Sequence, residues 1–187
     1  MSGGAGPGDP SCILVLGLGN VLLADDGVGP LALARLERDY CIPHGVRLAE
    51  GGTLGLALLD EIAQAQHLIL VDAVATEEPP GTLVRLDGQA VRDAVRDRLS
   101  VHQVGVADLL DAARLIGRYP ASVVLLGIVP DRIGLAVTRT RAVEEALPAL
   151  VRAVVDELRA HGHELDPQKC PAALDRPIHA LVRHFGL

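Results

Sequence analysis

The stretch Cys12-Ile-Leu-Val-Leu-Gly17 is a short run of apolar residues that ends in glycine. Such a run is typical of a strand that is buried on both faces of a parallel sheet. Residues 27–40 follow it with an apolar stripe at helical spacing and with charged residues between, which predicts an amphipathic helix. The fold therefore begins with a strand followed by a helix.

The same alternation continues along the chain. Further strands are predicted at 46–49, 67–71, 82–86 and 122–129, and further helices at 54–65, 104–116 and 141–160. Pro148 should either kink the last helix or mark where it begins. Strands that alternate with helices favour right-handed crossovers and a sheet covered on both faces. We therefore predict an α/β fold, a three-layer α/β/α sandwich with a mostly parallel sheet.

A chain of 187 residues fits one domain with flanking segments. Residues 1–11 are rich in Gly and Pro and are predicted to be a flexible N-terminal segment. Residues 12–164 should form the α/β domain. Residues 165–187 carry three prolines and are predicted to be a C-terminal appendage, so a chain that ends near Glu164 should keep its fold and activity.

Charge and cysteine content limit the possible partners. The chain has 17 Lys and Arg against 24 Asp and Glu, and the basic residues are interspersed with acids, so we expect no nucleic-acid partner. The three cysteines are widely separated, which favours free thiols and a cytoplasmic location. No apolar run reaches the length of a membrane span.

Acidic residues follow three of the predicted strands. Asp25 and Asp26 come after the first strand, Glu50 ends the second, and Asp72 ends the third. Ligands of open α/β sheets bind beyond the carboxyl ends of the strands. Each acid taken alone could be a helix cap or part of a turn. Asp72 is harder to explain in this way, because it directly follows four aliphatic residues and a buried charge needs a partner.

His102 is the histidine that we select as a candidate ligand. It lies in the polar segment Leu99-Ser-Val-His-Gln-Val-Gly105, which leads into a predicted helix. The six other histidines are interpreted as surface or capping residues: His44, His67, His161, His163, His179 and His184. Two carboxylates and one imidazole would suit a divalent ion such as Ni²⁺ or Zn²⁺ and would leave coordination positions open.

Four segments carry a family resemblance: Gly17-Leu-Gly-Asn-Val-Leu-Leu-Ala-Asp-Asp-Gly-Val-Gly29, Glu50-Gly-Gly-Thr-Leu-Gly55, His67-Leu-Ile-Leu-Val-Asp-Ala73 and Ser100-Val-His-Gln-Val-Gly105. In this order and spacing they resemble the hydrogenase maturation proteases, over residues 12–162. The resemblance implies an endopeptidase that removes the C-terminal extension of a nickel-iron hydrogenase large-subunit precursor after nickel insertion.

The resemblance also assigns residues. It makes Asp26, Asp72 and His102 the metal-binding and catalytic residues, although many members have Glu at the position of Asp26. Asp25 and Glu50 become candidates for supporting these residues or for contacting substrate. Nickel is expected to arrive with the precursor, and zinc or another divalent ion could act as a surrogate.

The hydrolytic mechanism stays open at this level. A metal could polarise the scissile carbonyl or lower the pKa of a bound water, with Asp25, Asp26 or Glu50 accepting a proton. The sequence has no H-E-x-x-H helix, no G-x-S-x-G elbow and no paired Cys/His signature.

Two other classes of function remain as alternatives. Gly17-Leu-Gly19 after a strand, with Glu50 ending the next strand, could belong to a nucleotide-binding Rossmann-like domain. Against this, the third fingerprint glycine would fall at Leu22, and Asp25 and Asp26 would crowd a pyrophosphate. A non-catalytic nickel-binding chaperone would use the same ligands but release no peptide.

Overall fold

The computed structural model of the chain describes residues 12–51, 57–96 and 104–167. The elements in chain order are β1 (Ile13–Gly17), η1 (Asp25–Gly27), α1 (Val28–Asp39), β2 (Val46–Glu50), α2 (Ala57–Gln64), β3 (His67–Ala73), β4 (Leu83–Asp87), α3 (Gly88–Arg96), α4 (Val104–Leu115), β5 (Ser122–Ile128) and α5 (Arg141–Ala160). Here η1 is a single 3-10 turn.

The strands form a five-stranded sheet in the order β2-β1-β3-β5-β4. β1 pairs in parallel with β2 and β3, and β3 pairs in parallel with β5. β4 is antiparallel to β5 and lies at the edge of the sheet. The four parallel strands therefore bring their carboxyl ends to one edge, which confirms the predicted mostly parallel sheet.

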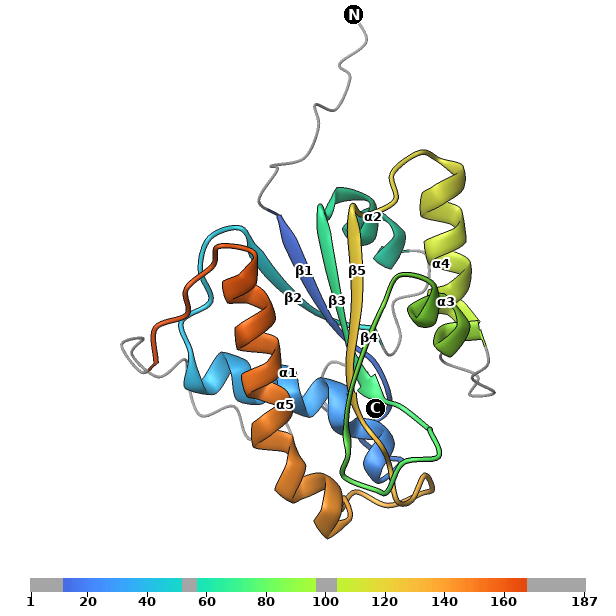
Figure 1. Cartoon of the computed structure of the whole chain (residues 1–187), viewed down its shortest axis with the longest axis vertical. Helices are drawn as coiled ribbons and strands as arrows, with labels where there is room; N and C mark the ends of the chain where they lie inside the picture. The colour runs from blue at the N-terminus through green and yellow to red at the C-terminus, as the bar shows by residue number, and fades with distance from the viewer. Residues whose placement is uncertain (1–11, 52–56, 97–103, 168–187) are drawn as a thin grey trace, which may run out of the picture.

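Helices cover both faces of the sheet (Figure 1). The side chains of each inner strand alternate between two apolar cores. One core holds Val15, Ile69 and Val124 against α1 and α5. The other core holds the residues that alternate with these, such as Leu14, Leu70 and Leu125, against α2, α3 and α4. The predicted three-layer α/β/α sandwich is therefore confirmed.

Three details differ from the sequence predictions. Helix α3 was not predicted, because it begins with glycine and, of its described side chains, Val91 alone is buried in the core. Strand β3 continues to Ala73, so Asp72 lies within the strand instead of after it. Helix α5 begins at Arg141 and runs through Pro148, so this proline does not mark the helix start.

The boundary predicted at residue 164 falls slightly too early. Leu165 is 5% exposed and packs into the core with α1 and α5. The backbone N–H of Cys41 donates to the carbonyl of Asp166 at 3.3 Å, and Tyr40 forms a β-bridge with Pro167. The domain therefore includes residues 165–167. The predicted segment 1–11, and residues 168–187 of the predicted appendage 165–187, lie outside the described residues.

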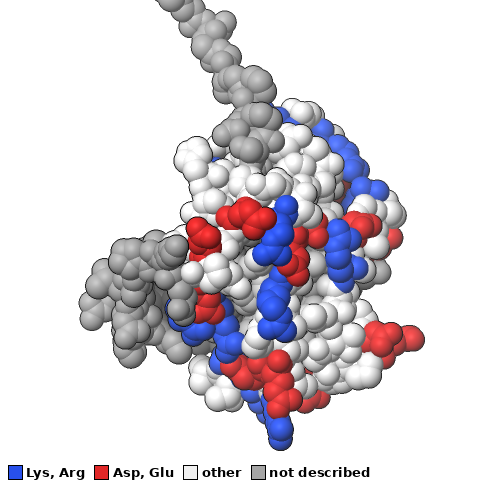
Figure 2. Space-filling view, turned by 60° about the vertical axis from the view of Figure 1, so that its left-hand side comes forward, with Lys and Arg blue, Asp and Glu red and all other residues white. Residues whose placement is uncertain are grey.

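Acidic and basic side chains alternate on the face shown in Figure 2, in agreement with the interspersed charges of the sequence. Ion pairs among the described residues include Arg85 with Glu157 and Arg139 with Glu144. Among the described residues, none of the helices is both long enough and apolar enough to cross a membrane.

Candidate active site at the carboxyl edge of the sheet

The four acids selected from the sequence lie at the carboxyl edge of the parallel strands. Asp25 and Asp26 form the turn η1 between β1 and α1. Asp72 is the penultimate residue of β3, and Glu50 is the last residue of β2. Asp25, Asp26 and Asp72 are the buried polar or charged residues among those described, with exposed fractions of 0%, 4% and 1%. Burial of three carboxyl groups at one edge requires specific partners.

Asp26 is held by the loop that follows β1. The backbone N–H of Asn20 donates to Oδ2 of Asp26 at 2.7 Å. Gly19 has a φ of +106°, and a Cβ at this position would lie only 1.8 Å from the carbonyl oxygen of Asp26. Glycine is therefore required at position 19, since any side chain would push the loop away from Asp26.

Asp72 faces the side of the sheet covered by α2, α3 and α4, because it shares the alternation of Leu68 and Leu70. Its Oδ1 accepts a hydrogen bond from the backbone N–H of Ala73 at 2.6 Å. Its register partner in β5 is Gly127. Asp72 is thus held near the carboxyl end of β3, the central strand of the sheet.

Close backbone packing brings the two acidic segments to the same edge. The N–H of Leu18 donates to the carbonyl of Val71 at 2.8 Å. A Cβ on Gly29 would lie 2.2 Å from the carbonyl oxygen of Leu18 and 2.4 Å from that of Val71. The absence of a side chain at Gly29 therefore lets the start of α1, and with it η1, lie directly against β1 and β3.

Asp25 has a different environment from Asp26. Its Oδ1 accepts from the N–H of Thr140 at 2.7 Å, and its Oδ2 accepts from the hydroxyl of Thr140 at 2.8 Å and from the N–H groups of Asp131 and Arg132 at 3.0 Å each. Burial acts to raise the pKa of Asp25, but the hydrogen bonds from Thr140, Arg132 and Asp131 outweigh it and hold the pKa below its ordinary value. These bonds disfavour Asp25 as the group that accepts a proton.

His102 lies outside the described residues. Helix α4 begins just after it, at Val104, and packs on the face of the sheet to which Asp72 belongs. Within the described parts of the chain, no group of three or more His, Cys, Asp and Glu side chains is arranged to hold a metal ion. The predicted convergence of His102 with Asp26 and Asp72 remains a prediction.

Sequence reasoning missed two residues that shape this edge. Asn20 holds Asp26 through its backbone N–H, and its side-chain Oδ1 accepts from the N–H of Leu22 at 2.9 Å. Thr140 binds Asp25 through both its N–H and its hydroxyl. The position of Asn20 in the glycine-rich loop was a signal that could have identified it. No sequence pattern could have paired Thr140 with Asp25, which lies 115 positions earlier in the chain.

A separate hollow of about 320 Å³ lies between β4 and α5 and is lined in part by Leu83, Leu150 and Ala153. None of its lining residues is a selected acid or histidine. We therefore place the candidate active site at the carboxyl edge and not in this hollow.

An α/β/α sandwich with buried acids at the carboxyl edge belongs to the class of α/β proteins that bind ligands or substrates at this edge. Comparison with known proteins identifies the family within this class. The family model described as hydrogenase maturation protease matches residues 31–157. The hydrogenase 2 maturation protease of Escherichia coli (strain K12) is 35% identical over 158 residues, which cover 84% of this chain and 96% of that protein.

Other relatives agree with this match. The hydrogenase expression/formation protein HoxM of Azotobacter vinelandii is 41% identical over 122 residues, although the match spans only 59% of that protein and 65% of this chain. The solved structure of the hydrogenase maturating endopeptidase HybD from E. coli superimposes with a TM-score of 0.80 at 35% identity, and the match covers 84% of this chain and 98% of that one. The chain belongs to the hydrogenase maturation protease family and is an endopeptidase of that family.

Proposed function

We propose that this endopeptidase removes the C-terminal extension of a nickel-iron hydrogenase large-subunit precursor after nickel has been inserted. The observation that carries the proposal is the burial of Asp26 and Asp72 at one edge of the sheet in a chain of this family. Buried carboxylates that are held in place by backbone N–H groups are suited to contact a cation or a polarised substrate group.

We further propose that Asp26, Asp72 and His102 form the metal-sensing and catalytic set. The position of α4 supports this, since its first residue follows His102 and the helix packs on the face to which Asp72 belongs. Two carboxylates and an imidazole are sufficient to contact a divalent ion but leave coordination positions open. Nickel in this proposal belongs to the substrate, where thiolates of the precursor would hold it more strongly, and zinc could act as a surrogate.

A divalent ion at this edge could polarise the scissile carbonyl or activate a water molecule. The protein's own contribution is to hold the acids in fixed positions. Asp25 is occupied by four hydrogen bonds. Asp26 and Glu50 are therefore the better candidates for accepting a proton, because Glu50 is only half-buried at the end of β2.

The proposal is tested by incubating metal-free protease with nickel-loaded and nickel-free precursor and by measuring the released C-terminal peptide by mass spectrometry. Cleavage of the nickel-loaded precursor alone is expected. The variants Asp26→Ala, Asp72→Ala and His102→Ala should lose this activity, while His44→Ala, at an exposed position, should keep it. Equal cleavage of both precursors would contradict nickel sensing, and full activity of His102→Ala would contradict the residue assignment.

The same experiment separates the alternatives. A nickel-binding chaperone would bind the loaded precursor and release no peptide. A nucleotide-binding domain is not supported, because Gly19 makes room for the carbonyl of Asp26 and two buried carboxylates stand where a pyrophosphate would need free N–H groups.

A further inference from the structure

Four large apolar side chains are exposed close to the candidate active site. Leu22 is 52% exposed, Ile133 55%, Leu135 90% and Val137 68%. Three of them alternate along the segment that joins β5 to α5, and Leu22 lies in the loop between β1 and η1. We name this set the apolar rim. Clustered exposed apolar side chains are unusual on a monomer and commonly mark a binding surface.

Backbone hydrogen bonds hold the two segments of the rim side by side. The N–H of Ala136 donates to the carbonyl of Leu22 at 3.0 Å, and the N–H of Ala24 donates to the carbonyl of Ala136 at 2.6 Å. Ala24 has a φ of +53°, which costs energy for a residue with a side chain. The bonds between the segments maintain this unfavourable conformation.

The rim is joined directly to the site. The N–H of Asp26 donates to the carbonyl of Leu23 at 3.2 Å, so Leu22 and Asp26 belong to one compact turn. The bonds from Thr140, Asp131 and Arg132 to Asp25 fix the other segment of the rim to the same turn. The rim therefore has a fixed position relative to Asp26 before any partner binds.

We propose that the apolar rim is the surface on which the precursor polypeptide docks when its scissile bond is brought to Asp26. This rests on the proposed function. The occupant is a polypeptide because an endopeptidase must hold the chain that it cuts, and the loop that carries Leu22 also carries Asp26. A preformed rim of apolar side chains binds apolar residues of the precursor next to the cleavage point without the entropic cost of ordering a loop.

The chain offers a matched control at the other end of the molecule. Leu115 is 88% exposed and Ile116 is 55% exposed. They follow one another at the carboxyl end of α4, which leads back to the start of β5 at the opposite edge of the sheet (Figure 1). Substitutions there change the same kind of exposed surface but lie far from Asp26.

The experiment compares the wild-type protein with Leu135→Ser/Val137→Ser and with Leu115→Ser/Ile116→Ser, using nickel-loaded precursor over a range of concentrations. The rim variant should raise the KM for precursor by about tenfold or more, as expected for loss of apolar contacts at an interface. Its kcat and its thermal midpoint should change little, because both side chains already face solvent. The control variant should have the KM of the wild type.

An unchanged KM in the rim variant would overturn the docking proposal while cleavage by the wild type still supported the proposed function. Failure of the wild type to cleave the precursor would instead overturn the proposed function.

Sedimentation of the free proteins completes the test. If the wild type is a dimer and the rim variant a monomer with unchanged KM, the rim joins two copies of the chain and the docking proposal is wrong. The rim substitutions are also made in a chain that ends at Pro167. If they no longer raise the KM there, residues 168–187 occupy the rim, and the docking proposal is wrong.

Discussion

Asp25 and Asp26 are neighbours in the sequence and both are buried, yet their surroundings differ. Oδ2 of Asp26 accepts one hydrogen bond from the nearby N–H of Asn20. Asp25 accepts four, all from the segment between β5 and α5. We therefore assign Asp25 to the positioning of the turn, and Asp26 remains the residue that we propose to contact substrate.

The variant Asp25→Asn tests this assignment. An amide would retain one acceptor oxygen but would place its NH₂ group against backbone donors, so the free energy of unfolding should fall by about 2–4 kcal/mol. Urea denaturation of the purified protein measures this change. Asp131→Asn is the control, because the Asp131 side chain is exposed and only its backbone N–H binds Asp25. Equal stability of the two variants would contradict the assignment.

The pKa of Asp25 also determines a pH effect on that variant. Because the pKa of the folded-state carboxyl is lowered, Asp25 stabilises the fold at pH values above its unfolded pKa, and this contribution is lost as the pH falls through the lower folded value. The difference in stability between the wild type and Asp25→Asn should therefore be largest near neutral pH and should shrink in acid.

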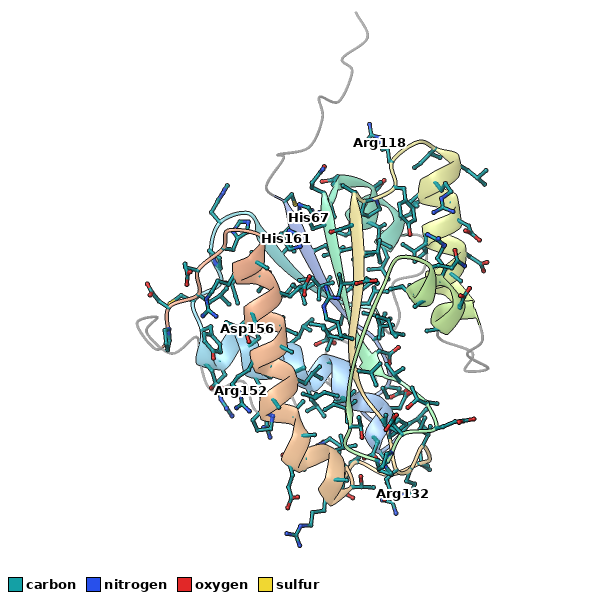
Figure 3. All side chains as sticks on the ribbon, viewed as in Figure 1. His67, Arg118, Arg132, Arg152, Asp156 and His161 are labelled. Carbon is teal, nitrogen blue, oxygen red and sulfur yellow. The ribbon has the colours of Figure 1, made fainter. Side chains whose placement is uncertain are left out.

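His67 lies at the opposite edge of the sheet from Asp25. It predicts a loss of stability in mild acid, at a higher pH than the loss that Asp25 predicts. His67 lies beside His161 (Figure 3), with 4.0 Å between the ring centroids. The Nδ1 atom of His67 lies 2.7 Å from the hydroxyl oxygen of Ser122. Burial, followed by the charges of His161 and His163, lowers the pKa of His67. The unfolded chain therefore takes up a proton more readily than the folded one, and stability should decline as the pH falls below about 6.5, the ordinary histidine pKa.

Thermal unfolding between pH 7.5 and 5 measures this effect in the wild type and in His67→Gln. The glutamine variant can still bond to Ser122 but has no ring to protonate, so its midpoint should depend less on pH. His44→Gln, at an exposed site, should retain the full dependence of the wild type. Parallel curves for the wild type and His67→Gln would show that His67 is not responsible.

At the scale of elements, the sequence predicted the strands well because buried parallel strands are uninterrupted apolar runs. The runs before Gly17, Asp72 and Val129 all became inner strands. Helix α3 was missed because an edge helix needs few apolar residues. The candidate acids could be predicted because parallel strands share one carboxyl edge. The bonds to Asp25 could not, since hydrogen bonds between distant loops leave no periodic pattern in the sequence.

The contact between α1 and the sheet predicts a severe effect of Gly29→Ala. The added Cβ would overlap the carbonyl oxygens of Leu18 and Val71, which are backbone atoms that cannot move aside cheaply. We expect a loss of at least about 3 kcal/mol of stability, measured by urea denaturation. Gly134→Ala is the matched control, because a Cβ there meets no atom within 4 Å. A stable Gly29→Ala protein would show that α1 can shift away from β3 without cost.

At the scale of the whole molecule, the extent of the domain can be tested by truncation. A chain ending at Pro167 keeps the buried Leu165 and the contacts of residues 166 and 167 with the end of α1, whereas a chain ending at Glu164 loses them. The shorter chain should be less stable by about 2–3 kcal/mol, the value of one buried leucine. Thermal or urea unfolding of the two chains compares them directly. Equal stability of the two chains would show that the domain ends at residue 164, as predicted from the sequence.

The bonds to Asp25 join positions that are 106 to 115 residues apart in the chain. Ribosomes release a protein from its N-terminus, so the turn with both acids emerges long before the residues that bind Asp25. Until residues 131–140 have left the ribosome, the carboxylate of Asp25 lacks its full set of donors, and we expect the turn not to take its final conformation. We therefore expect proteolytic activity to begin only when nearly the whole domain has been released from the ribosome.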